Sequence, residues 1–250
     1  MSFCDDCFKG VTHKGIPTGK WEKIGDVDCY VAIPKGDYPE DKVVLYLCDV
    51  FGPSFENNQL LCDDFANNGF KIIAPDYFSG DPIPLSIFEQ GETFDRNAWK
   101  SRHGPEQTRP LLDKVITALK EQGVKRFGAT GYCFGARYVF DLAFDHVIDV
   151  SVVAHPSQLK IPEDLEKYAS TVKAPLLINS CTDDAQFPLE AQAKADEIFG
   201  NDKFTPGYVR EYFEGCSHGF AVRGDMSNPK VKAGKEGAFK ASIEWFRKYL

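Results

Sequence analysis

Short runs rich in β-branched and aromatic residues alternate along the chain with amphipathic stretches. This pattern predicts a parallel sheet with helices on both faces. The run VVLYLC at 43–48 is apolar almost throughout, which is typical of a strand covered on both sides, so we place it at the centre of the sheet. The predicted strands are 28–33, 43–48, 71–75, 126–130, 150–154, 176–179 and 208–213.

Between the strands, apolar residues recur at helical spacing. Leu60, Leu61 and Phe65, for example, share one helical face and are followed by Gly69, a common helix stop. The predicted helices are 57–68, 106–122, 134–144, 189–199 and 235–249.

The segment 76–104 is the longest part without a predicted element, and it is rich in proline, glycine and polar residues. Loops of this length in compact domains are usually functional or mobile. It follows a predicted strand, at the edge of the sheet where ligands bind in open α/β folds. We therefore expect substrate contacts within it.

Composition narrows the class of protein. A chain of 250 residues with 43% apolar and 26% charged residues fits one soluble globular domain spanning 1–250. No apolar run is long enough to cross a bilayer, and the start MSFCDDCFKG lacks the pattern of a secretory signal, so we predict a cytoplasmic protein. A net charge of −8 argues against a nucleic-acid partner, and eight scattered cysteines favour reduced thiols.

The stretch GYCFG at 131–135 places a cysteine between two glycines, after a predicted strand and before a predicted helix. Strand, GxCxG and helix are the context of a nucleophile elbow, a tight turn that exposes the central side chain at the carboxyl end of a sheet. The helix start favours negative charge on the sulfur, and the N–H of Phe134 is a candidate oxyanion donor. The alternative is that Cys133 is a small buried residue.

A nucleophile of this kind needs a base and an orienting acid, which in this architecture follow it in the order acid, then histidine. Among five histidines only His218, in FEGCSHGF, lies in a loop near the C-terminus after a predicted strand. Asp183 and Asp184 lie before it in CTDDAQFP. We prefer Asp184, because Phe187 and Pro188 form the turn before the next helix.

The motifs GYCFG, DDAQFP and HGF, together with CDVFG at 48–52, resemble those of the dienelactone hydrolase family. The resemblance extends from about residue 18 to the C-terminus and implies a mostly parallel α/β-hydrolase fold. It implies a catalytic triad of Cys133, Asp184 and His218, with no cofactor.

The same resemblance assigns further roles. Asp49 occupies the position of a family glutamate that interacts with the cysteine in the resting state, and the N–H of Val50 would be the second oxyanion donor. Arg223 is the candidate for binding a substrate carboxylate. A second family arginine is replaced by Gly80, which implies that one of two anion contacts is missing.

These observations predict hydrolysis of a carboxylic ester or lactone, a small-molecule substrate, through a thioester on Cys133. Two alternatives remain: a thiol redox-responsive protein, and a small-molecule receptor on a hydrolase fold. The natural substrate and the oligomeric state are left open by the sequence.

Two other features have weaker interpretations. His155, in AHPSQL, follows a predicted strand and is a candidate ligand contact. Cys4 and Cys7 form a CxxC pair with His13 and Cys29 in the same part of the chain, but a structural zinc needs four ligands and no second pair is present. We therefore predict no metal.

Overall fold

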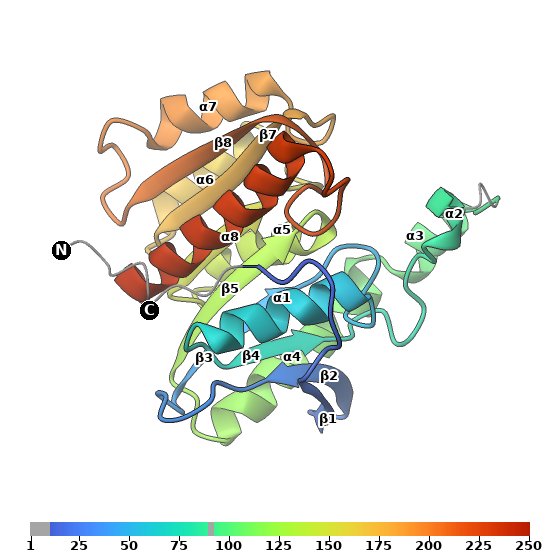
Figure 1. Ribbon diagram of the computed structural model, residues 1–250. Helices are drawn as coiled ribbons and strands as arrows, with labels where there is room; N and C mark the ends of the chain where they lie inside the picture. Colours follow the sequence, from blue (N-terminus) through green and yellow to red (C-terminus); the bar gives the residue numbers. More distant parts are fainter. Residues whose placement is uncertain (1–10, 90–92) are drawn as a thin grey trace.

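One eight-stranded sheet runs through the molecule (Figure 1). The computed structural model describes residues 11–89 and 93–250. From one edge to the other the strands are β1 (Lys20–Ile24), β2 (Val27–Ala32), β4 (Ile72–Pro75), β3 (Lys42–Leu47), β5 (Arg126–Tyr132), β6 (Val150–Ala154), β7 (Leu176–Asp183) and β8 (Tyr208–Ser217).

The sheet is parallel from β4 to β8, and only β1 and β2 join it in antiparallel pairs. The predicted central strand, β3, lies between β4 and β5, and five of its six residues are buried. The prediction of a mostly parallel sheet with that run at its centre is confirmed. Parallel strands end at a common edge, so the residues after β3, β5, β6, β7 and β8 lie near one another.

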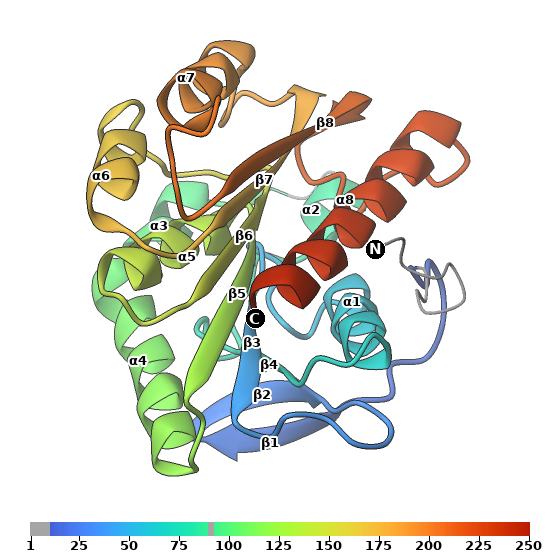
Figure 2. The same cartoon turned by 90° about the vertical axis from the view of Figure 1, so that its left-hand side faces the viewer.

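Helices cover both faces of the sheet, as predicted (Figure 2). One face carries α1 (Glu56–Asn67) and α8 (Pro229–Tyr249); the other carries α4 (Pro105–Glu121), α5 (Phe134–Phe144), α6 (Glu163–Thr171) and α7 (Leu189–Phe199). The buried aromatic rings of Phe65, Phe239 and Phe246 pack together where α1 meets α8.

Several elements differ from the sequence prediction. The edge strand β1 was missed because four of its five residues are exposed, so no buried face marks it. The last helix begins at Pro229 rather than at 235, because the side chain of Asn228 accepts the N–H of Lys230 and a proline is favourable in the first turn. The segment 76–104 contains two short helices, α2 (Ser86–Glu89) and α3 (Arg96–Arg102).

No helix in the described residues is long and apolar enough to cross a membrane. Cys4 and Cys7 lie outside the described residues.

Candidate active site

Cys133 is the residue immediately after β5 and precedes the first residue of α5. Its backbone has φ 48° and ψ −110°, a conformation that non-glycine residues rarely adopt. Backbone strain of this kind costs on the order of 1–3 kcal/mol and concentrates at functional sites. Of the six cysteines in the described part of the chain, Cys133 alone is partly exposed.

The two glycines of the elbow are required by close approach. A Cβ at Gly135 would lie 2.0 Å from the carbonyl oxygen of Leu47 on β3, and a Cβ at Gly131 would lie 2.7 Å from the carbonyl oxygen of Gly135. Both contacts are with backbone, which cannot move aside as a flexible side chain could. The start of α5 is thereby pressed against the end of the central strand.

His218 and Asp184 form a hydrogen-bonded pair at the ends of β8 and β7. Each is the residue immediately after its strand, and Nδ1 of His218 lies 2.8 Å from Oδ1 of Asp184. The same carboxylate oxygen accepts the N–H groups of Gln186 and Phe187, which fixes its orientation. The neighbouring Asp183 has an exposed side chain, and its backbone carbonyl accepts the N–H of His218.

The surroundings of His218 favour its charged form. Burial opposes the positive charge, but hydrogen bonds to Asp184 and Cys133 outweigh it and raise the pKa of His218 to about 10. Asp184 and Cys133 therefore both stabilise a proton on the imidazole ring.

Two backbone N–H groups of residues that line the cavity described below, Val50 after β3 and Phe134 in the elbow, have no protein acceptor in the described part of the chain. The carbonyl of Cys133 accepts N–H groups from Ala136 and Ser157, so the N–H of Phe134 in the same peptide unit points the other way. The carbonyl of Val50 is held by the N–H of Ile83 at 2.8 Å.

A cavity of about 540 Å³ opens onto these groups. Cys133, His218, Val50, Phe134 and Arg223 all line it. Seven residues of the segment 76–104 also line it: Ile83, Ile87, Arg96, Trp99, Lys100, His103 and Gly104. That they contact a substrate stays a prediction.

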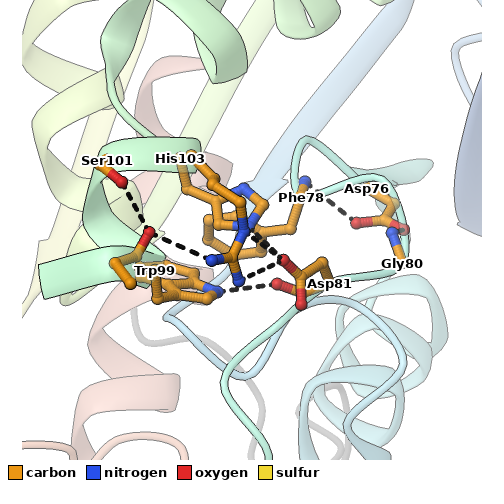
Figure 3. Close-up of polar contacts among 9 residues, drawn as sticks. Asp76, Phe78, Gly80, Asp81, Trp99, Ser101 and His103 are labelled. Atoms are coloured by element: carbon orange, nitrogen blue, oxygen red, sulfur yellow. Dashed lines mark hydrogen bonds and ion pairs between the residues drawn. The ribbon is translucent and has the colours of Figure 1, made fainter. Parts of the chain in front are cut away.

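Hydrogen bonds to Asp81, in the loop after β4, hold α3 against that loop (Figure 3). Trp99 Nε1 donates to the backbone carbonyl of Asp81 at 2.8 Å, and His103 Nε2 lies 2.8 Å from its carboxylate. Arg102 also pairs with that carboxylate, and the bonds from His103 and Arg102 lower the pKa of Asp81. Trp99 is 2% exposed, with its ring against those of Phe78 and His103.

Gly80 lies on an exposed turn of the same loop. It has φ 77°, its N–H donates to Asp76 Oδ2 at 2.7 Å, and it is not among the residues that line the cavity. Arg223 does line the cavity, with its guanidinium 4.9 Å from the centre of the Phe51 ring.

Asp49 is only 2% exposed, two residues beyond the end of β3. Its Oδ1 accepts the side-chain amide of Asn58 at 3.1 Å and the N–H of Phe51 at 3.2 Å. Burial raises the pKa of Asp49, while these bonds and the positive charges of Arg223 and His218 oppose the shift. The carboxylate thus lies close enough to the site to sense its charges.

His155 is fully buried and does not line the cavity. Its ring lies edge-on to that of His218, with centroids 5.0 Å apart, and burial together with the charges of His218 and Arg223 lowers its pKa well below the usual value. The structure therefore places His155 against His218 rather than at the cavity, so it is not positioned to contact a ligand there.

Ser157, which the sequence analysis did not select, does line the cavity, with its Oγ 3.6 Å from the sulfur of Cys133. Its position was indicated indirectly: it follows the strand next to the elbow strand, in the same motif as His155. Among residues 11–89 and 93–250, no group of three or more possible ligands could hold a metal ion.

Comparison with known proteins gives one consistent family. The model of the dienelactone hydrolase family matches residues 27–250. A hydrolase named tropI from Talaromyces stipitatus is 34% identical over 98% of this chain and 95% of its own, and dienlactone hydrolase 1 from Gibberella moniliformis is 31% identical over 98% and 93%.

The fold also matches solved structures. A Klebsiella pneumoniae structure assigned to the dienelactone hydrolases has a TM-score of 0.70 at 19% identity, covering 93% of this chain and 99% of the other. The fold is that of the α/β-hydrolases, and the chain belongs to the dienelactone hydrolase family of hydrolytic enzymes.

Proposed function

We propose that this protein hydrolyses a carboxylic ester or lactone through a triad of Cys133, His218 and Asp184, with a thioester on Cys133. One observation carries the proposal: the 2.8 Å bond between His218 and Asp184 and the strained elbow of Cys133 meet in one cavity. The names of the relatives support the substrate class, since they include dienlactone hydrolases and carboxymethylenebutenolidase homologues.

The first half of the reaction forms the thioester. The thiol proton passes to His218, and the sulfur of Cys133 attacks the acyl carbon. The N–H groups of Val50 and Phe134 are the donors for the oxyanion, and one such donor is worth roughly 2.7–4 kcal/mol in related hydrolases. The imidazolium of His218, stabilised by Asp184, then protonates the leaving oxygen as the carbon–oxygen bond breaks.

The second half releases the acid. His218 takes a proton from water, the resulting hydroxide attacks the thioester, and the same two N–H groups hold the second oxyanion. The carbon–sulfur bond then breaks, the carboxylic acid is released, and the proton on His218 passes to the departing sulfur, which restores the thiol and the neutral imidazole. Arg223, at the cavity, is placed to pair with a carboxylate on the substrate, and Asp49 to adjust the charge balance around the sulfur.

Neither alternative from the sequence has a specific observation in its favour. A redox role would be served by a second thiol at the site, and among the described residues Cys133 is the only cysteine that lines the cavity. A receptor would not need the hydrogen-bonded acid and base. We retain the cytoplasm as the proposed location.

The test is hydrolysis of para-nitrophenyl acetate and of a dienelactone by the wild type, Cys133→Ala and His218→Ala. We expect kcat to fall by roughly 10⁴-fold or more in both variants, as when a nucleophile or base is removed from a triad. Acid quenching should trap an acyl adduct on Cys133 of the wild type, identified by peptide mass. Equal rates in the three proteins would refute the triad, and binding without turnover by the wild type would favour the receptor.

A further inference from the structure

Ser157 is held against the nucleophile by the backbone. The N–H of Cys133 donates to the carbonyl of Ala154, and the N–H of Ser157 donates to the carbonyl of Cys133, each at 3.2 Å. The end of β6 and the segment after it therefore bond to both backbone groups of Cys133, its N–H and its carbonyl. His155, between the two bonds, has φ 39°, and Gln158 has φ 61°, so the backbone accepts strain to follow this path.

The side chain of Ser157 is correspondingly fixed. The residue is 5% exposed, and its Oγ lies 3.6 Å from Sγ of Cys133, within the range of a hydrogen bond to sulfur. In the described part of the chain its hydroxyl has no other hydrogen-bond partner. A buried hydroxyl without a partner would be costly, so the contact with sulfur satisfies it.

We propose that Ser157 is a further catalytic residue, whose hydroxyl donates to the thiolate of Cys133. A thiolate has no proton to give, so in the charged state the hydroxyl must be the donor. Together with His218 on the other side, it supplies the sulfur with a second donor. This role rests on the proposed function of Cys133 as nucleophile.

The donor has a chemical purpose because the sulfur becomes negatively charged when its proton passes to His218, before it attacks the acyl carbon. Hydrogen bonds to a charged group are roughly twice as strong as those between neutral groups. When sulfur attacks the acyl carbon its charge moves to the oxyanion, and the hydroxyl of Ser157 stays close to the sulfur that must leave again. The expected signature is a change in how thiol reactivity depends on pH, together with a lower kcat.

The experiment measures alkylation of Cys133 by iodoacetamide against pH, with peptide mapping, in the wild type, Ser157→Ala and Ser157→Thr. We expect the midpoint of the pH profile to rise by about one unit in Ser157→Ala, because the free energy of one hydrogen bond to a charged group corresponds to about one pKa unit. With para-nitrophenyl acetate, kcat should fall about tenfold at neutral pH with KM unchanged. Ser157→Thr, which keeps the hydroxyl, should return both values toward the wild type.

Ser151→Ala is the matched control. Ser151 is a buried serine on β6 whose Oγ accepts a hydrogen bond from the Tyr168 hydroxyl at 2.7 Å. Ser151→Ala therefore removes a buried hydroxyl that does not contact the sulfur of Cys133. We expect it to lower thermal stability without moving the alkylation profile. Should Ser157→Ala not fold, Ser157→Gly also removes the hydroxyl.

The outcomes separate this proposal from the proposed function. If Ser157→Ala and Ser151→Ala both keep the wild-type pH profile, Ser157 has no catalytic role, whatever the activity of Cys133→Ala. If Cys133→Ala stays fully active, the triad itself is refuted instead. A fall in activity equal in Ser157→Ala and Ser157→Thr would mark Ser157 as structural and overturn the proposal.

Discussion

The cavity has two sides of different construction. One, which we call the triad side, carries the proposed triad of Cys133, Asp184 and His218, each the residue immediately after a parallel strand. The other, the α3 side, consists of α3 and the loop after β4, joined by the contacts of Asp81 with Trp99 and His103. The positions of these three residues follow from the sheet, whereas the α3 side is held by the buried ring of Trp99 and a few side-chain bonds.

The difference separates the reaction from the choice of substrate. A parallel sheet brings the ends of β5, β7 and β8 to one edge, so Cys133, Asp184 and His218 are positioned by the core beneath them. The α3 side depends on the buried ring of Trp99, on its indole bond to the backbone of Asp81, and on the Asp81 carboxylate, whose side chain is about half exposed, 51%. Substitutions on the triad side should change kcat, and those on the α3 side should change KM.

Apart from the changes at Cys133 and His218, the largest effect is expected from Asp184→Asn. The neutral amide no longer stabilises the imidazolium of His218, and kcat should fall roughly 10³- to 10⁴-fold, as for the acid of a serine triad. The control is Asp183→Asn, an exposed neighbour, which should stay within about twofold of the wild type. Steady-state kinetics with a soluble ester measures both, and a larger loss in Asp183→Asn would assign the acid to Asp183.

The placement of Cys133, Asp184 and His218 at one edge of the sheet could be predicted from the sequence because its signals are local. The glycines of the elbow are dictated by contacts with Leu47 and within the turn, and the acid and base follow strands in a fixed order. The preference for Asp184 over Asp183 agrees with the observed hydrogen bond to His218. The mostly parallel sheet followed from the alternation of apolar runs in the same way.

The α3 side could not be predicted in detail, because no short motif encodes it. Asp81 meets His103 across 22 positions of chain, and the helix between them is too short to show a helical period. Composition indicated only that the segment 76–104 would be functional. Ser157 was missed for a related reason: its contact with Cys133 arises from pairing of β5 with β6, not from a pattern of its own.

A smaller effect on the triad side is expected from pH. His218 has a folded-state pKa of about 10, above the value of about 6.5 in an unfolded chain. Its contribution to stability is therefore fully present below about pH 6.5 and is lost as the pH rises through 10. Urea unfolding measures the folding equilibrium constants of the wild type and of His218→Gln between pH 6.5 and pH 10. Across that range we expect the ratio of the two constants to fall by more than tenfold. An unchanged ratio would contradict the coupling of His218 protonation to folding.

The smallest effect is expected on the α3 side, from Asp81→Ala. The change removes the acceptor of His103 and Arg102 but leaves the bond from Trp99, which goes to the backbone, so α3 should stay attached and become less ordered. We expect KM to rise about threefold to tenfold with kcat within about twofold, since the triad is untouched. Asp113→Ala is the control: it removes a similarly exposed carboxylate, 50% against 51%, that pairs with Arg109 on α4. A fall in kcat as large as the rise in KM would mean that α3 positions Cys133, His218 and Asp184 as well as the substrate. The two sides of the cavity would then depend on each other for their positions.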